Sequence, residues 1–336
     1  MKPNEKLITI RGNEKKIEQL LQELVFQPRL KAIEWSRITH QTPNIKIGYP
    51  GQHLASLITG MLGERTGARG NDIIDGTEVK SCSRIDQLDK CNQCDLPVAR
   101  LEEKCPHCGS ADIIRNNDSK WLFTIRNEDD LRVLLHGVKR ILLLIGHYPF
   151  FDKNDFENIR ITAYEVWPEN KRQKRFGEIM TNYYEKIYLA HRRLNPSKTP
   201  APKNFWPFQY QFYLCNPIEI FSCDVANINV SPKIKVTKYI QPEVNREQLV
   251  SVDMPSEILT LDEIALLLKK AKPEELVTYP KDGKSLEKLK EAVRAGDINA
   301  AQKLLPTINE ALKSYLPLRD TDIIAVAKKK YQRRNN

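Results

Sequence analysis

Four cysteines in two close pairs constrain the fold of this chain more than any other feature. Two residues separate Cys91 from Cys94 and likewise Cys105 from Cys108, and ten residues lie between the pairs. Two such knuckles bring four thiolates to tetrahedral spacing around Zn²⁺. A four-cysteine site leaves no open coordination position, so we expect a structural metal. The pattern predicts a zinc ribbon over residues 89–111, with these four cysteines as ligands.

The length and charge of the chain limit what surrounds this ribbon. The 336 residues correspond to about two domains, and 40% hydrophobic with 29% charged residues is ordinary for a soluble globular protein. Lys and Arg exceed Asp and Glu by 53 to 43, and this surplus of ten positive charges favours a nucleic-acid partner. Residues 1–23 are charged throughout, and no apolar run approaches the ~20 residues of a membrane span. We therefore expect a cytoplasmic protein and exclude a membrane protein.

Hydrophobic periodicity divides the chain into four stretches. Residues 1–48 have helical periodicity, and residues 49–168 alternate helix and strand signals around the ribbon. Residues 169–255 begin with a basic amphipathic helix and continue into an aromatic segment, which we interpret as a DNA-contacting or interface region. Residues 256–336 form a string of short helices, one of which begins with a Thr260 to Glu263 capping box.

Residues 71–80 carry the clearest chemical signal. Two short β-leaning runs are separated by Asp75-Gly76, which is a strong hairpin signal. Because side chains alternate across a strand, Glu78 and Lys80 share one face of the second run. Two carboxylates and an ammonium on one face would pack poorly, but hard oxygen ligands of this kind suit Mg²⁺. The segment therefore predicts a magnesium site.

The register of the hairpin decides which aspartate joins Glu78. A two-residue turn would place Asp72 on the wrong face. A three-residue loop over residues 74–76, with Gly76 left-handed and bulged, pairs Asp72 directly with Glu78. We predict the longer loop, in which Asp75 is a turn residue. Asp75 is the alternative ligand if the other register holds.

This segment resembles the active site of the PD-(D/E)xK nuclease superfamily. In that pattern an aspartate opens the second strand of a mixed sheet, and an acid and a lysine follow on the third. Asn71 replaces the proline of the pattern here, and the two acids are closer together than usual. Further runs are similar to MamI-type type II restriction endonucleases, most clearly over residues 50–165. These runs are Pro50–Gly60, Thr66–Asp72, Glu78–Cys82 and Asp86–Cys91.

The resemblance implies a fold and an activity. The fold would be an α/β, mixed-sheet nuclease core with an inserted zinc ribbon and a C-terminal helical region. The activity would be Mg²⁺-dependent cleavage of double-stranded DNA at a short defined sequence by a homodimer in a prokaryotic cytoplasm, without a small-molecule substrate. Asp72 and Glu78 would hold Mg²⁺ with the Val79 carbonyl, and Lys80 would orient the attacking water. Glu64 is the candidate for the further acid that a preceding helix often supplies, or else it is an exposed charge near the helix end.

For several basic side chains the sequence allows more than one role. Arg65 and Arg69 flank the predicted site and could touch phosphate or be solvated. Lys90, Arg100 and Lys104 could bring the ribbon to DNA. The helix after residue 169 could contact the DNA backbone, or it could be a solvated face whose tyrosines pack inward. Its basic residues and tyrosines are Lys171, Arg172, Lys174, Arg175, Lys186, Arg192, Arg193, Tyr183, Tyr184 and Tyr188.

Two other functions fit the same features. One is a repair or structure-specific nuclease built on the same core. The other is a non-catalytic zinc-ribbon regulator that binds DNA, in which residues 72–80 are only a hairpin. Discrete DNA fragments that depend on Mg²⁺ would distinguish the restriction enzyme from both.

Overall fold

A computed structural model describes residues 1–44, 47–65, 71–276 and 283–320. The chain divides into two compact units. Unit 1 comprises residues 1–122, 136–167 and 219–249, and unit 2 comprises residues 123–135, 168–218 and 250–336. No helix among the described residues is both long and apolar enough to cross a membrane.

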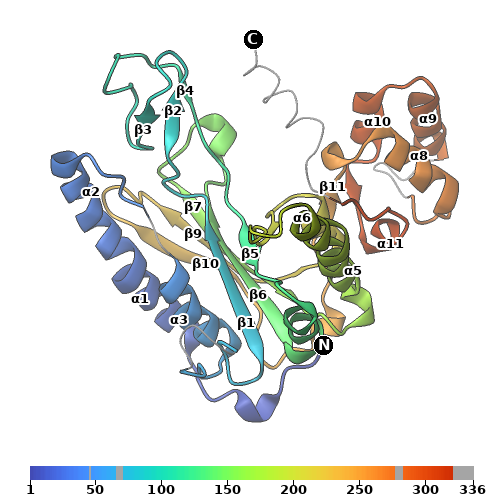
Figure 1. The fold of residues 1–336 in the computed structure, drawn as a ribbon, viewed down its shortest axis with the longest axis horizontal. Coiled ribbons are helices and arrows are strands. Elements are labelled where there is room, and N and C mark those ends of the chain that lie inside the picture. The colour runs from blue at the N-terminus through green and yellow to red at the C-terminus, as the bar shows by residue number, and fades with distance from the viewer. Residues whose placement is uncertain (45–46, 66–70, 277–282, 321–336) are drawn as a thin grey trace. The chain divides into compact units, whose positions relative to one another are not determined.

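A five-stranded mixed sheet forms the centre of unit 1 (Figure 1). Its order is β1-β6-β7-β9-β10, with β1 parallel to β6 and with β6–β7 and β9–β10 antiparallel. This mixed sheet confirms the predicted α/β class. The strands are β1 (Thr77–Ser83), β6 (Arg140–His147), β7 (Ile159–Val166), β9 (Ile218–Ala226) and β10 (Lys233–Tyr239).

The sequence of each strand explains its place in the sheet. β6 is an almost continuous apolar run and is buried along nearly its whole length, as expected for a central strand covered on both faces. β1 alternates buried and half-buried residues at one edge. β10 carries Lys233, Lys235 and Lys238 at the other edge of the sheet, and these charges discourage pairing with another chain.

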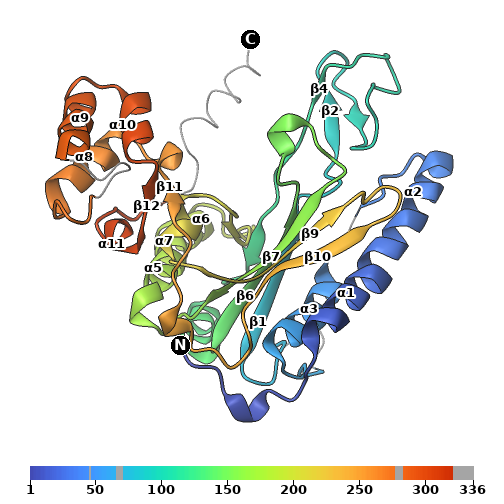
Figure 2. The same ribbon diagram turned by 180° about the vertical axis from the view of Figure 1, so that it is seen from behind.

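Three helices run along one face of this sheet, as both sides of the ribbon drawing show (Figures 1 and 2). They are α1 (Asn13–Leu21), α2 (Gln27–Thr39) and α3 (Gly48–Thr59), with a π-helical turn, Gln22–Phe26, joining α1 to α2. Gly51 lets α3 approach β1 closely, because a Cβ atom built there would lie only 2.3 Å from the Ser81 Oγ. The helix that precedes the predicted site is thus held directly against the strand that carries it.

The ribbon is a small three-stranded sheet of order β3-β2-β4. Its strands are β2 (Asp89–Cys91), β3 (Pro97–Val98) and β4 (Ile113–Ile114). Arg100 is buried, pairs with both carboxylate oxygens of Asp89 and lies over the rings of Tyr148, Phe151 and Phe156. Arg100 therefore anchors the ribbon to the core and does not face solvent.

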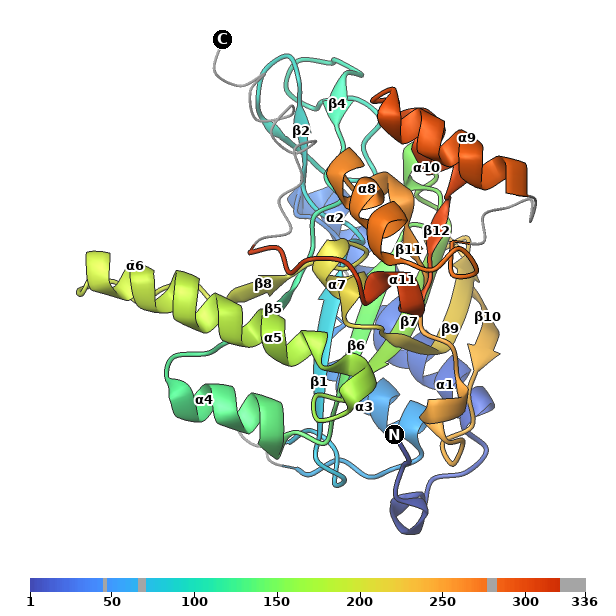
Figure 3. The same ribbon diagram turned by 90° about the vertical axis from the view of Figure 1, so that its right-hand side faces the viewer.

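Unit 2 is mainly helical (Figure 3). The capping box of Thr260 and Glu263 is confirmed at the start of α8, and Asp297 caps α10. Of the short helices expected over residues 256–336, any part in residues 277–282 or 321–336 lies outside the described residues. The elements are β5 (Trp121–Phe123), α4 (Glu128–Arg132), α5 (Arg175–Asn182), α6 (Leu189–Leu194), β8 (Lys203–Phe205), α7 (Tyr210–Leu214), β11 (Met254–Pro255), α8 (Leu261–Lys270), α9 (Gly283–Arg294), α10 (Ile298–Leu304), β12 (Thr307–Ile308) and α11 (Glu310–Lys313).

The basic helix of this unit is largely structural. A π-helical segment, Tyr183–Tyr188, joins α5 to α6, and its three tyrosines are buried. Arg172 pairs with Glu310 at 2.7 Å, and Arg175 donates to the carbonyl oxygens of Ser314 and Leu316. These two arginines therefore tie the helix to the C-terminal region, while Arg192 and Arg193 remain exposed.

Candidate active site

The predicted three-residue loop is present at the start of β1. Ile73 bridges Thr77 in antiparallel fashion, which leaves residues 74–76 as the loop, and Gly76 has a φ of +87°. The Gly76 amide donates to the Ile73 carbonyl at 3.0 Å. Asp72 consequently lies opposite Glu78, as the longer loop requires. The strand expected over residues 71–74 is reduced to the single bridge at Ile73.

Asp75 is a buried turn residue. One carboxylate oxygen accepts hydrogen bonds from the Thr77 amide and hydroxyl, and the other accepts from Arg140 Nη2 at 2.9 Å. The Asp75 side chain is only 4% exposed. Arg140 also pairs with Glu165, which in turn binds Arg246, and all three of these side chains are fully buried. Burial raises the pKa of Glu165, but the two guanidinium groups outweigh it and hold that pKa below its ordinary value.

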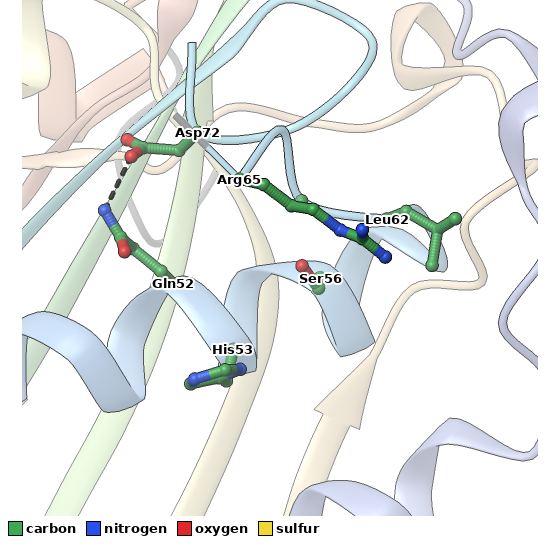
Figure 4. Close-up of a pocket in the computed structure, with 7 residues that line it drawn as sticks. Gln52, His53, Ser56, Leu62, Arg65 and Asp72 are labelled. Carbon is green, nitrogen blue, oxygen red and sulfur yellow. Dashed lines mark hydrogen bonds between the residues drawn. The ribbon is translucent and has the colours of Figure 1, made fainter. Parts of the chain in front are cut away.

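Asp72 is held from both sides. Its backbone amide donates to the Thr77 carbonyl, and its own carbonyl accepts from the Glu64 amide. Its carboxylate accepts from the Val79 amide at 2.7 Å and from the Gln52 Nε2 at 2.6 Å (Figure 4). The carboxylate therefore lies at the free edge of β1, where the Val79 amide has no partner strand.

Glu78 and Lys80 lie on the same face of β1, as predicted. Glu78 Oε1 and Lys80 Nζ are 2.7 Å apart, and both side chains are partly exposed, at 22% and 28%. Burial raises the pKa of Glu78 against the attraction of Lys80, and the charge of Asp72 raises it further. Burial also raises the pKa of Asp72, although the Val79 amide, Lys80 and Gln52 oppose the shift.

Two carboxylates and one ammonium thus meet at a partly buried point of the sheet edge. The carboxylates interact with each other and with Lys80, and their raised pKa values show that the protein stabilises their charge incompletely. A cation bound between them would supply the missing stabilisation. The donor set therefore fits a hard divalent ion, with Asp72 and Glu78 as candidate ligands.

The preceding helix contributes an amide to this site. Gln52 of α3 contacts Asp72, whereas Glu64 lies four residues beyond the C-cap of the helix, with an exposed side chain and only its backbone bonded to Asp72. No sequence motif singled out Gln52 as a site residue. The neighbouring Gly51, which permits close helix–strand packing, is the one local signal that could have pointed to it.

A cavity of about 340 Å³ opens next to Asp72. Arg65 lines this cavity, while Arg69 lies outside the described residues. The lining residues are Gln52, His53, Ser56, Leu62, Gly63, Arg65 and Asp72 (Figure 4).

The four ribbon cysteines converge as their spacing predicts. Their sulfur atoms all lie within 4.8 Å of one another, with 3.6 Å between Cys91 and Cys108 and 3.5 Å between Cys94 and Cys105. A tetrahedron with zinc–sulfur bonds of about 2.3 Å has edges of about 3.8 Å. The cluster therefore could hold a metal ion of that size with small adjustments.

Comparison with known proteins relates the chain to a family of restriction endonucleases. The family model described as MamI restriction endonuclease matches residues 34–257. The type II restriction enzyme MamI of Microbacterium ammoniaphilum is 31% identical over 74 residues, which cover 22% of this chain and 24% of that protein. The aligned stretch thus spans about a quarter of that relative, and no solved structure matches the chain. Because the family model extends from within α2 to just past β11, the chain belongs to the MamI restriction endonuclease family.

Proposed function

We propose that this protein is a Mg²⁺-dependent type II restriction endonuclease that hydrolyses double-stranded DNA at a short specific sequence. Family membership supports the restriction endonuclease activity. The convergence of Asp72, Glu78 and Lys80 at one edge of the sheet is the observation that carries the chemistry. Asp75, the alternative ligand, is buried and bound to Arg140, so we assign it a structural role.

Asp72 and Glu78 would hold the Mg²⁺ ion. The Val79 carbonyl is a further candidate ligand, because the N–H and C=O of one strand residue face the same side and the Val79 amide faces Asp72. When bound, Mg²⁺ supplies Lewis-acid stabilisation of the phosphodiester and lowers the pKa of a coordinated water. The hydrogen bonds from Val79 and Gln52 fix the Asp72 carboxylate in place before any substrate arrives.

Lys80 would act on the attacking water. Its ammonium lies at Glu78 and is partly exposed, so it can donate a hydrogen bond to a water beside the scissile phosphate. Its positive charge also stabilises the negative charge that develops on the phosphoryl oxygens. Glu64 remains a predicted additional ligand, and Glu64→Ala measures its contribution.

The proposal includes a structural zinc and a symmetric assembly. Cys91, Cys94, Cys105 and Cys108 would hold Zn²⁺ in a closed site that stabilises a ribbon with little core of its own. A homodimer with two-fold symmetry would match a palindromic site, each subunit cutting one strand.

Plasmid cleavage tests the function. The wild-type protein with Mg²⁺ should give discrete fragments, and EDTA should prevent them. Glu78→Ala and Lys80→Ala should abolish cutting while DNA binding persists, whereas Glu34→Ala, at an exposed acid of α2, should cut normally. A smear would indicate a non-specific nuclease, and an intact plasmid would indicate a non-catalytic DNA-binding protein.

A further inference from the structure

We propose that the cavity beside Asp72 binds a second phosphate group of the cleaved strand, one nucleotide from the scissile phosphate. Arg65 and His53 would be the groups that contact it. This inference rests on the proposed function, since it takes Asp72 as the site of phosphodiester chemistry. It adds a subsite for DNA binding that lies outside the acids and the lysine.

The cavity has one wall in common with the catalytic site. Asp72 closes one end, where Gln52 reaches it from α3, and Arg65 extends away from that end along the loop that follows the helix (Figure 4). Ser56 faces the loop from the helix. A phosphodiester positioned at Asp72 continues into neighbouring phosphates, which follow at about 3.4 Å per nucleotide along the helix axis. The shared wall puts the cavity within reach of such a neighbour.

The charges of the lining suit an anion. Asp72 is the one acid among the lining residues, and its charge would be taken up by the divalent ion. Arg65 brings a permanent positive charge, and no acid forms an ion pair with it among the residues that the structure describes. His53 is exposed and offers an imidazole N–H on the helix side.

The backbone of Arg65 adds to this assignment. Its φ is +60°, in the left-handed region that residues with a Cβ rarely adopt. Such a conformation costs energy and persists where the surrounding structure imposes it, often at ligand contacts. Here it accompanies a guanidinium group that lines the cavity.

Gly63 provides a way to fill the cavity without straining the fold. A Cβ atom at Gly63 would lie 3.4 Å from the Asp72 carbonyl oxygen and 3.8 Å from the Ser56 Oγ, which are ordinary contact distances. Because Ser56 and Gly63 both line the cavity, the methyl group of Gly63→Ala would narrow it. Gly48→Ala is a matched control, since Gly48 is at the exposed start of the same helix with nothing within 4 Å of its Cβ position.

The salt dependence of DNA binding tests the subsite. We would measure the affinity for a fluorescent 20-base-pair duplex by anisotropy from 50 to 200 mM salt, with Ca²⁺ in place of Mg²⁺ so that a divalent ion is present while cutting is prevented. Each lost phosphate contact lowers the slope of log affinity against log salt by about 0.9. Arg65→Ala should lower the slope by that amount. The rise from 50 to 200 mM salt should then weaken DNA binding by this variant about 3.5-fold less than it weakens binding by the wild type. Arg65→Lys should restore the slope, because it keeps the charge.

Each outcome decides the proposal. Gly63→Ala should weaken binding severalfold, while Gly48→Ala should bind like the wild type. An unchanged slope in Arg65→Ala, or an equal fall in Arg37→Ala on α2, would overturn the subsite and leave the proposed nuclease intact. Equal weakening by the two glycine variants would also overturn the subsite. A wild-type protein that binds no duplex would overturn both the subsite and the proposed function.

Discussion

Asp75→Asn should destabilise the protein while leaving the proposed metal ligands Asp72 and Glu78 in place. The Asp75 carboxylate offers one oxygen to Thr77 and the other to Arg140, so both face donors. An amide has one acceptor atom and one NH₂ group. Whichever way it is oriented, its NH₂ group meets either the Thr77 amide or the Arg140 guanidinium, and neither can accept a hydrogen bond from it.

The size of the effect follows from the burial of the pair. Removing one partner from a buried ion pair costs roughly 3–5 kcal/mol. Arg140 keeps its bonds to Glu165 and to the Thr77 hydroxyl, so we expect the lower end, about 3 kcal/mol. At about 2–4 °C per kcal/mol for a unit of this size, the Tm of unit 1 should fall by about 6–12 °C.

Asp72→Asn should give the opposite pattern. Burial raises the pKa of Asp72, so its charge is not a source of stability in the metal-free protein. The new amide can still accept from Val79, and Gln52 can turn its own amide oxygen toward the NH₂ group, so the Tm should stay within about 2 °C. Cutting should fall on the order of 10²-fold or more, as when an enzyme loses one electrostatic contact to the transition state. Asp75→Asn, assayed well below its Tm, should keep cutting within about tenfold.

Thermal melting and plasmid cleavage of the two variants therefore test the register of the hairpin. A Tm change below about 2 °C for Asp75→Asn would refute the energetic reasoning about the buried pair. Normal cutting by Asp72→Asn, together with loss of cutting by folded Asp75→Asn, would show that Asp75 and not Asp72 is the metal ligand.

Four further predictions concern the Asp72 and Glu78 pair and the ribbon. Because the pKa values of Asp72 and Glu78 are raised, acidification should abolish cutting at a higher pH than it would if these carboxylates had ordinary pKa values. Added Mg²⁺ should lower the pH at which cutting is half-maximal. The folded state also holds these protons more tightly, so metal-free stability should fall as pH rises through the raised pKa values, and Mg²⁺ should increase the Tm more at pH 8 than at pH 5. The proposed zinc predicts about one Zn²⁺ per wild-type chain by atomic absorption, and Cys108→Ser should lose it and expose the ribbon to protease. Arg100→Met should destabilise unit 1 by roughly 3–5 kcal/mol in denaturant unfolding, with no change in the salt slope of DNA binding.

The features that the sequence predicted correctly depend on short-range rules. The left-handed Gly76, the shared face of Glu78 and Lys80 and the convergence of the ribbon cysteines follow from spacing within a few residues. Such patterns restrict the backbone locally, whatever packs around them. The mixed sheet followed from the apolar runs together with the family resemblance.

The features that the sequence left undetected depend on tertiary packing. Gln52 reaches Asp72 across 20 residues only because α3 packs against β1 at Gly51. Arg100 and Arg172 were candidates for DNA contact because the sequence around a basic residue does not reveal which acidic side chain it pairs with in the fold. Their true partners, Asp89 and Glu310, become visible only once the fold is known.

The hairpin shows how environment separates two aspartates of the same type. Asp75, at the loop, faces the interior, where Arg140 neutralises it and the pair is sealed from water. Asp72, three residues earlier, accepts hydrogen bonds from the neutral Val79 amide and Gln52, and the attraction of Lys80, which pairs with Glu78, does not outweigh the effect of its burial. An edge strand with an unpaired backbone is normally a liability. Here the arm that carries Asp72 covers part of that edge, and the carboxylate it places there retains a charge that the proposed Mg²⁺ ion would neutralise.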